Sequence, residues 1–508
     1  MKLIIRGRLK MLFNSVEFLI FFPIVTLVYF IVPAKIKHFW LLASSYFFYM
    51  CWNAKYALLL FTSTLLTYLS GLLLERVKHA DMSPRQRATN KKWIVAICVA
   101  LNLGILFYFK YTQFAFNLLS RALSLLHIRY NAPTFDIILP VGISFFTFQA
   151  LSYTIDVYRD DIYAEKNFIR YALFVSFFPQ LVAGPIERSK NLLRQIAVPK
   201  KFSFDNAREG LLLMLWGYFL KIVLADRISL FVDTVYSDHA TYGGYYIVFA
   251  TILFAVQIYC DFSGYSTIAM GAARVLGIEL MENFNAPYLA TSIADFWRNW
   301  HISLTSWFKD YLYIPLGGNC KGVARGYLNK LIVFFLSGLW HGAAVTYVLW
   351  GLLNGVYQIV GQLLRPMREG CLRVLRLNPD SIGHRLLRVG ITFVLVDFSW
   401  LFFRASNIHE AFHMLSSVFS ARNIHVLFDG SLYNCGLDRA NFSLMVLGIC
   451  VLFFADFCKH RGICIRKVVI QQDYWFRWVF IAASVLALLL FGKWGPSFDK
   501  AAFIYFQF

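Results

Sequence analysis

The chain has 508 residues, of which 59% are hydrophobic and only 15% are charged. A soluble domain of this size needs far more charge to cover its surface, so the composition excludes an ordinary water-soluble protein. Runs of about 17 or more apolar residues recur along the whole length, which predicts an all-α polytopic membrane protein.

The net charge of +21 would indicate a nucleic-acid partner in a soluble protein. Here the basic residues gather in short loops between apolar runs, for example at residues 75–92 and 365–388. Cytoplasmic loops of membrane proteins carry such an excess of lysine and arginine. We therefore expect the partners to include membrane lipids and no nucleic acid.

The apolar runs in chain order, together with a helical hairpin at residues 331–364, predict about eleven transmembrane helices. The single runs are residues 16–32, 39–51, 56–74, 93–119, 137–155, 211–224, 245–276, 387–403, 442–457 and 479–491.

Proline and glycine interrupt the pattern at two places. Residues 168–184 contain Pro179 and are followed by a basic loop, so we interpret them as a re-entrant segment covered by protein or water. Residues 245–276 are too long for one straight span of about 20 residues, and Gly264 is the expected break. Asp261 in the same run is a second candidate for a buried functional charge; the interpretation that we favour is that it holds the break by hydrogen bonding.

The first ten residues, MKLIIRGRLK, are basic and are followed by Met11. Counting spans back from the basic loop at residues 75–92 places them outside the cytoplasm, where such charge is unfavourable. We interpret residues 1–10 as an upstream extension and residues 11–508 as a single membrane domain. Both termini and the long loop at residues 404–441 are predicted to be extracytoplasmic.

The stretch at residues 294–342 carries the main functional signal. It begins ADFWRNWHISLTSWFKDYLYIPLGG, passes through a short basic loop and ends FFLSGLWHG. Its two histidines, His301 and His341, lie among aromatic and aliphatic residues. An ionisable side chain at membrane depth is costly, so both are candidate site residues.

His341 lies at the turn of the predicted hairpin. Its imidazole titrates near neutrality and can take a proton from a hydroxyl or a thiol. Gly342 would let backbone or substrate come close, and Ser337 lies one helical turn earlier, where it could form a Ser–His pair. The structural alternative is a histidine that hydrogen-bonds between helices.

His301 lies in a more polar segment. On one continuous helix, Trp297, His301, Thr305 and Phe308 would share a face. The segment could line a wet cavity, or it could be an aromatic anchor at the lipid headgroups.

The residue types alone leave other classes open. Two intramembrane histidines could be axial haem ligands, metal ligands or a proton relay in a transporter without enzymatic activity. No acidic residue has ligand spacing to either histidine, and Cys458, His460 and Cys464 lack a fourth ligand. We predict no metal site.

Several long blocks of sequence are similar to those of a known family. They include LFNSVEFLIFFPIV at 12–25, FFPQLVAGPIER at 177–188, NFNAPYLATSIADFWRNWHISLTSWFKDYLYIPLGGN at 283–319 and LSGLWHGAAVTYVLWGLLNG at 336–355. The chain resembles the membrane-bound O-acyltransferase family, in its bacterial alginate O-acetyltransferase branch, over nearly its whole length from Met11.

The resemblance implies that His341 in the WHG motif is the essential histidine and that His301 in the RNWHISLT motif is the second family histidine. It further implies a central tunnel in which cytosolic acetyl-CoA, the expected acyl donor, meets an extracytoplasmic hydroxyl. No bound cofactor is expected.

The resemblance also implies a bacterial inner-membrane enzyme that O-acetylates a cell-surface polysaccharide, either an alginate-like exopolysaccharide or peptidoglycan. Its partner would be a periplasmic acetyltransferase with a serine nucleophile, for which the loop at residues 404–441 and the terminal FIYFQF are candidate docking points. The alternatives are a D-alanyl or lipid acyl transferase of the same family and the non-enzymatic transporter. The residues do not distinguish among the acceptors.

Overall fold

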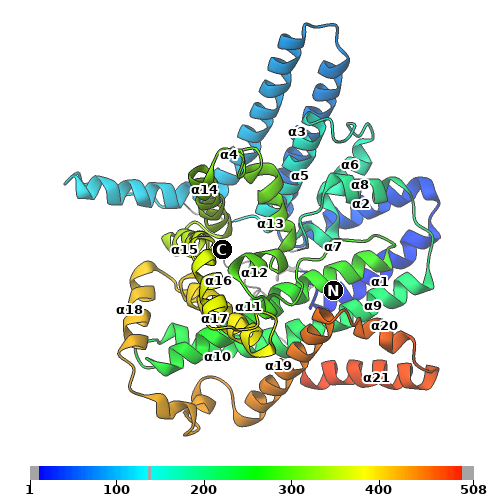
Figure 1. The fold of residues 1–508 in the computed structure, drawn as a ribbon. Helices are drawn as coiled ribbons and strands as arrows, with labels where there is room; N and C mark the ends of the chain where they lie inside the picture. Colours follow the sequence, from blue (N-terminus) through cyan, green and yellow to red (C-terminus); the bar gives the residue numbers. More distant parts are fainter. Residues whose placement is uncertain (1–10, 136–138, 183, 495–508) are drawn as a thin grey trace. The chain divides into compact units, whose positions relative to one another are not determined.

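The computed structural model describes residues 11–135, 139–182 and 184–494, and within these residues every regular element is a helix (Figure 1). This confirms the predicted all-α fold class. The chain divides into two compact units, one comprising residues up to 214 together with 268–281 and the other comprising 215–267 and the chain from 282 onward. The upstream extension and the terminal FIYFQF lie outside the described residues.

The first unit holds the helices of the amino-terminal part of the chain. In it α3 packs against α4 and α5, and α2 packs against α6. Its helices are α1 (Val16–Ile31), α2 (Ala34–Met50), α3 (Ala54–His79), α4 (Pro84–Leu125), α5 (Ile143–Tyr158), α6 (Phe168–Ser176), α7 (Phe178–Leu181) and α8 (Ser189–Ala197).

Helices α9 (Phe204–Tyr218) and α11 (Tyr245–Val275) contribute residues to both units. In the second unit α14 packs along α15, and α15 also contacts α12 and α17. Its elements are η1 (Phe219–Ala225), α10 (Asp226–Ser237), η2 (Pro287–Leu289), α12 (Ile293–Asn299), α13 (Ile302–Phe308), η3 (Lys309–Tyr313), α14 (Val323–His341), α15 (Val345–Leu363), α16 (Arg365–Val374), α17 (Ile382–Arg404), α18 (Ile408–Phe419), η4 (Ile424–Leu427), η5 (Ser431–Asn434), α19 (Arg439–His460), α20 (Ile465–Ile470) and α21 (Tyr474–Phe491).

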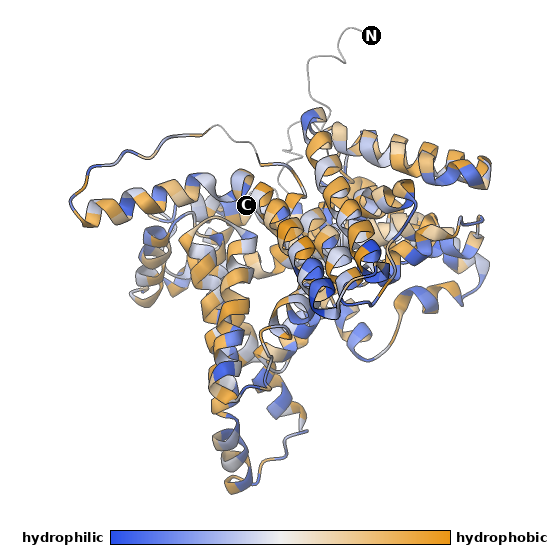
Figure 2. Cartoon of the chain, turned by 90° about the horizontal axis from the view of Figure 1, so that it is seen from above, coloured by the Kyte–Doolittle hydropathy of each residue, from blue (hydrophilic) through white to orange (hydrophobic). Residues whose placement is uncertain are grey.

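Six of the described helices are long and apolar enough to cross a membrane, namely α3, α4, α11, α17, α19 and α21. Figure 2 shows apolar residues along the helices and polar residues gathered near helix ends and in connecting segments. The chain is therefore an integral membrane protein. The predicted count of about eleven spans is not confirmed, because the other described helices fall short of these criteria in length or in apolar character.

The segment interpreted as re-entrant forms two short helices. Asn167 caps α6 by accepting the N–H of Arg170, and the chain leaves helical geometry at Phe177 before Pro179 lies in the first turn of α7. Helices of nine and four residues are too short to cross the hydrocarbon layer of about 30 Å. The fold is consistent with a segment that does not cross; its re-entrant course stays a prediction.

The expected break at Gly264 is wrong, because α11 is continuous over 31 residues. A Cβ atom on Gly264 would lie 2.9 Å from the carbonyl oxygen of Gly217 in α9. The glycine is needed for the close approach of two helices, a use of small residues that is common between membrane helices. The sequence alone does not show whether a glycine breaks a helix or allows a close contact between two helices.

The role expected for Asp261 is also wrong. Lys221, in the π-helical segment η1, places its Nζ 2.7 Å from Oδ1 of Asp226 and 2.6 Å from Oδ1 of Asp261. All three side chains are buried. Asp261 thus pairs with a cation from another element, which compensates charges that would be very costly if buried alone.

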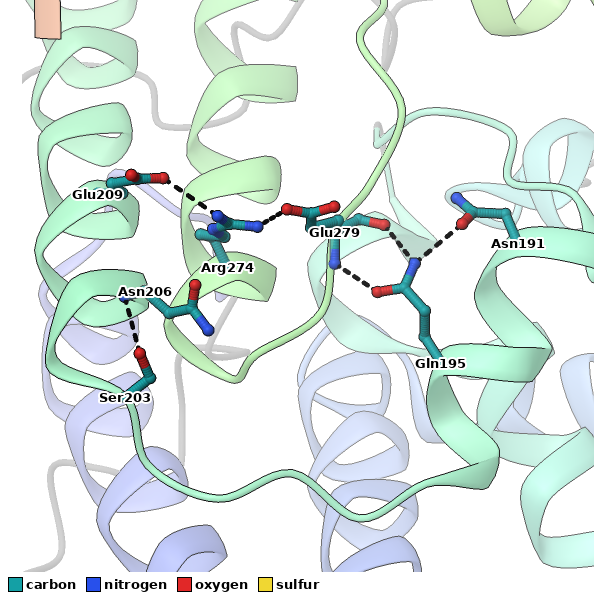
Figure 3. Close-up of polar contacts among 7 residues, drawn as sticks. All are labelled: Asn191, Gln195, Ser203, Asn206, Glu209, Arg274 and Glu279. Atoms are coloured by element: carbon teal, nitrogen blue, oxygen red, sulfur yellow. Dashed lines mark hydrogen bonds and ion pairs between the residues drawn. The ribbon is translucent and has the colours of Figure 1, made fainter. Parts of the chain in front are cut away.

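Polar contacts join α8 to the chain that follows α11. Gln195 donates to the carbonyl oxygen of Glu279 at 2.8 Å and accepts the N–H of the same residue at 2.8 Å (Figure 3). Arg274 pairs with the carboxylates of Glu209 and Glu279. Deeper in the same unit, the buried Glu187 accepts the N–H of Met281 and the side-chain amide of Asn191.

Replacing Glu187 with glutamine should flatten the pH dependence of thermal stability. Burial raises the pKa of the Glu187 carboxyl to about 7, whereas the unfolded chain titrates it near 4.3. The folded state therefore binds more protons between these values, and stability falls as pH rises from about 4.5 to 7. Melting temperatures of the purified protein at pH 5 and pH 8 should differ less in Glu187→Gln than in the unchanged protein. An equal difference in both would contradict this assignment.

Candidate active site

His301 lies between two short helices, α12 and α13. Ser292 caps α12 by accepting the N–H of Asp295 at 3.2 Å, and α12 ends at Asn299. Trp300 is extended, and His301 has a left-handed backbone with φ 43° and ψ 55° before α13 begins. The single helical face expected for residues 297–308 is therefore wrong, because the chain changes direction at His301.

His341 is the last residue of α14, and the predicted hairpin is confirmed in α14 and α15. The two helices approach closely at glycines. A Cβ atom on Gly338 would lie 2.3 Å from the carbonyl oxygen of Tyr347, and one on Gly351 would lie 2.3 Å from that of Phe334. Gly342 then leaves the helix in an extended conformation.

The structure brings the two predicted histidines together, although they are 40 residues apart in the chain. Their ring centroids lie 6.5 Å apart with an angle of 65° between the planes. His301 is 1% exposed and His341 is 4% exposed. The sequence indicated each histidine separately, and the fold places them side by side in one candidate site.

Aromatic side chains from four helices surround the pair. The Trp340 ring contacts both imidazoles, with ring centroids 5.8 Å apart for His301 and 4.9 Å apart for His341. Phe262 of α11 lies 4.6 Å from His301, and Trp350 of α15 and Phe403 of α17 lie 5.0 and 5.4 Å from His341. Sequence reasoning missed Phe262, Trp350 and Phe403, since aromatic residues are common throughout this chain.

The surroundings give the two imidazoles different electrostatic properties. His301 lies outside the candidate spans, and burial lowers the pKa of its imidazole to about 3, so this ring is neutral near pH 7. His341 is the last residue of α14 and lies at the carbonyl end of that helix. The His301 ring is thus suited to donate a hydrogen bond as a neutral group.

Ser337 shares α14 with His341 and is also buried. In the part of the chain that the structure describes, no three histidine, cysteine or acidic side chains come together as metal ligands. The prediction that the site contains no metal remains a prediction.

Comparison with known proteins gives the class of this site. The model of the membrane-bound O-acyltransferase family matches residues 162–374, which include both histidines. The chain is 33% identical to the probable alginate O-acetylase AlgI of Pseudomonas putida, over 98% of this chain and all of that protein. It is 31% identical to the peptidoglycan O-acetyltransferase of Helicobacter pylori, over 98% of each chain.

A third relative is more distant. The teichoic acid D-alanyltransferase of Bacillus subtilis is 26% identical over 56% of this chain and 73% of that protein. The helical membrane fold and these relatives define an integral membrane enzyme that transfers acyl groups. The chain belongs to the membrane-bound O-acyltransferase family and is an O-acyltransferase.

Replacing Gly338 with alanine should destabilise the hairpin that carries His341. The new methyl group would meet the backbone carbonyl of Tyr347, which cannot rotate away, so α14 and α15 must separate. Overpacking of this kind costs about 1–3 kcal/mol. The matched control is Gly361→Ala in α15, where a Cβ atom meets nothing within 4 Å. Melting temperature and acyl transfer should both fall in Gly338→Ala and stay near the unchanged values in the control; equal behaviour would contradict the packing argument.

Proposed function

We propose that this protein transfers an acetyl group from cytosolic acetyl-CoA to a hydroxyl acceptor outside the membrane, for O-acetylation of a cell-surface polysaccharide. The observation that carries the proposal is the buried pair of His301 and His341 in an O-acyltransferase. The relatives covered over most of their length are named as O-acetylating enzymes of alginate and of peptidoglycan, which supports acetyl as the acyl group.

In the proposed reaction His341 is the general base. It takes the proton of the acceptor hydroxyl as the oxygen attacks the carbonyl carbon of the thioester. The C–S bond then breaks, the new ester leaves, and the proton passes from His341 to the departing thiolate. Atoms and charge balance without a metal or a redox partner. The negative end of the α14 dipole stabilises the imidazolium that forms between the two steps.

His301 would stabilise the oxyanion of the same reaction. A neutral imidazole carries one N–H, and aromatic walls around it weaken competition from water. Since the ring centroids lie 6.5 Å apart, a carbonyl group placed beside both rings can be near His341 on one side and His301 on the other. Fixing both reactants in that arrangement would supply much of the acceleration.

The burial of both rings supports access through the interior of the protein. A charged coenzyme does not cross lipid, so donor and acceptor would reach the histidines along a tunnel from opposite faces of an inner membrane. A periplasmic acetyltransferase with a serine nucleophile would be the immediate partner. The segment at residues 404–441, which contains α18, η4 and η5, is the proposed docking point among the described residues.

The D-alanyltransferase relative motivates a second candidate. Transfer of D-alanine from a carrier-protein thioester would use the same pair of histidines. Since that relative covers a smaller share of this chain, acetyl transfer is the better-supported activity. Purified protein supplied with acetyl-CoA or with a D-alanyl carrier protein would separate the two by which thioester loses its acyl group.

Replacing His341 with alanine should abolish acetyl transfer. Loss of a general base lowers the rate by about 10²–10⁴-fold. The measurement is the release of free thiol from acetyl-CoA by purified protein with acceptor present, together with the acetyl content of the surface polysaccharide in cells. The matched control is His79→Ala, which removes an exposed histidine at the end of α3. A His341→Ala protein with full activity would remove the basis of the proposal.

Replacing His301 with asparagine should lower the rate without changing the shape of its pH profile. Asparagine tolerates the left-handed backbone and offers an N–H donor. Because His301 is neutral above about pH 4, its loss removes no ionisation between pH 5 and 9. His301→Ala, which lacks the donor, should lose about 10²–10³-fold. A basic limb of the profile that disappears in His301→Asn would show instead that His301 titrates during catalysis.

A further inference from the structure

Helix α13 begins in an unusual way. The residue before a helix normally has an extended backbone, and its side chain accepts an N–H from the first turn. Here that position belongs to His301, which is left-handed and makes no capping hydrogen bond with its side chain. The imidazole instead lies against Phe262 and Trp340. The first N–H groups of α13 must therefore be satisfied by another residue.

Asn283 supplies the acceptors for the first N–H groups of α13. Its backbone carbonyl accepts the N–H of Ile302 at 3.0 Å, and its side-chain Oδ1 accepts the N–H of Ser303 at 3.3 Å. These are the two residues directly after His301. The side-chain amide of Asn283 in turn donates to Oγ of Ser266 in α11 at 3.1 Å. One buried asparagine thus caps α13 from a distant segment and ties it to α11.

The surroundings hold this arrangement in place. Asn283, Ser266 and Ser303 are all buried, at 1%, 1% and 0% exposed. The ring of the next residue, Phe284, lies 5.0 Å from both Phe262 and Trp300. Residues 283 and 284 therefore hold both sides of His301. Asn283 binds the backbone that follows it, and Phe284 packs against Phe262, the ring that contacts its imidazole.

We propose that Asn283 is the positioning residue of His301. By capping α13 in place of the histidine, it stabilises the strained left-handed turn and holds the imidazole beside His341. Left-handed backbone at a residue other than glycine persists only where the surroundings impose it, and it is concentrated at functional sites. The inference rests on the proposed role of His301 in acyl transfer, because Asn283 would act on the reaction only through that ring.

The first test is kinetic. Asn283→Ala removes the side-chain cap and the link to Ser266, and should lower kcat by about 10- to 100-fold, the effect expected when a catalytic group moves by about 1 Å. The KM for the acyl donor should change by less than about threefold, since ground-state binding is retained. Asn285→Ala is the matched control: its side chain is exposed two residues away, and its backbone N–H still bonds to Asn299. The control should keep full activity.

A double-variant cycle separates positioning from general damage. If Asn283 acts through His301, adding Asn283→Ala to His301→Ala should cost nothing further, because coupled residues are not additive. Losses that multiply would overturn the proposal. Asn283→Asp keeps an acceptor for Ser303, and the hydroxyl of Ser266 can donate to it. It should therefore recover part of the activity lost in Asn283→Ala, and no recovery would count against the proposal.

The second test does not depend on activity. Hydrogen exchange of the peptide containing Ile302 and Ser303 should become faster in Asn283→Ala and stay unchanged in Asn285→Ala. Unchanged exchange in Asn283→Ala would overturn the inference whatever the kinetics show. Full activity of His341→Ala and His301→Ala would instead defeat the proposed function, so the two failures are distinguishable.

Discussion

The removal of two imidazoles from water is the constraint on which this structure depends. Aromatic side chains from α11, α14, α15 and α17 enclose His301 and His341. In such surroundings a charged ring is disfavoured unless a fixed charge or dipole compensates it, and every fixed dipole acts more strongly than it would in water. His341 lies at the carbonyl end of α14, whereas His301 lies at the amino end of α13, where the backbone dipole opposes a positively charged ring.

Glycines allow close approach between helices that carry the residues around the site. Gly338 and Gly351 let α14 and α15 approach until backbone meets backbone, and Gly264 does the same for α11 and α9. Lipid offers no hydrophobic drive for one apolar helix to pack on another, so close van der Waals contact between small residues has to provide it. The position of His341 is therefore decided by residues that carry no chemistry of their own.

Sequence reasoning predicted the fold class and the hairpin, and it singled out the two histidines that the fold places side by side, because each of these depends on local information. Apolar runs give helices, and a histidine among tryptophans is conspicuous. It failed where a residue's partner is distant in the chain. The sequence around Gly264 does not indicate that it packs against Gly217, and the sequence around Asp261 does not indicate that it pairs with Lys221. The turn at His301 was missed for the same reason, because it is maintained from Asn283 rather than by its immediate neighbours.

The buried group of Lys221, Asp226 and Asp261 bears on how such a chain is made. Each of these charges would be costly in hydrocarbon by itself. Lys221 and Asp226 leave the ribosome first, and Asp261 follows in the middle of α11. Helix α11 can therefore enter the lipid at low cost only after it meets the segment that precedes it. From this cost alone, we expect α11 and the segment that precedes it to be more stable in lipid as a pair than as separate helices.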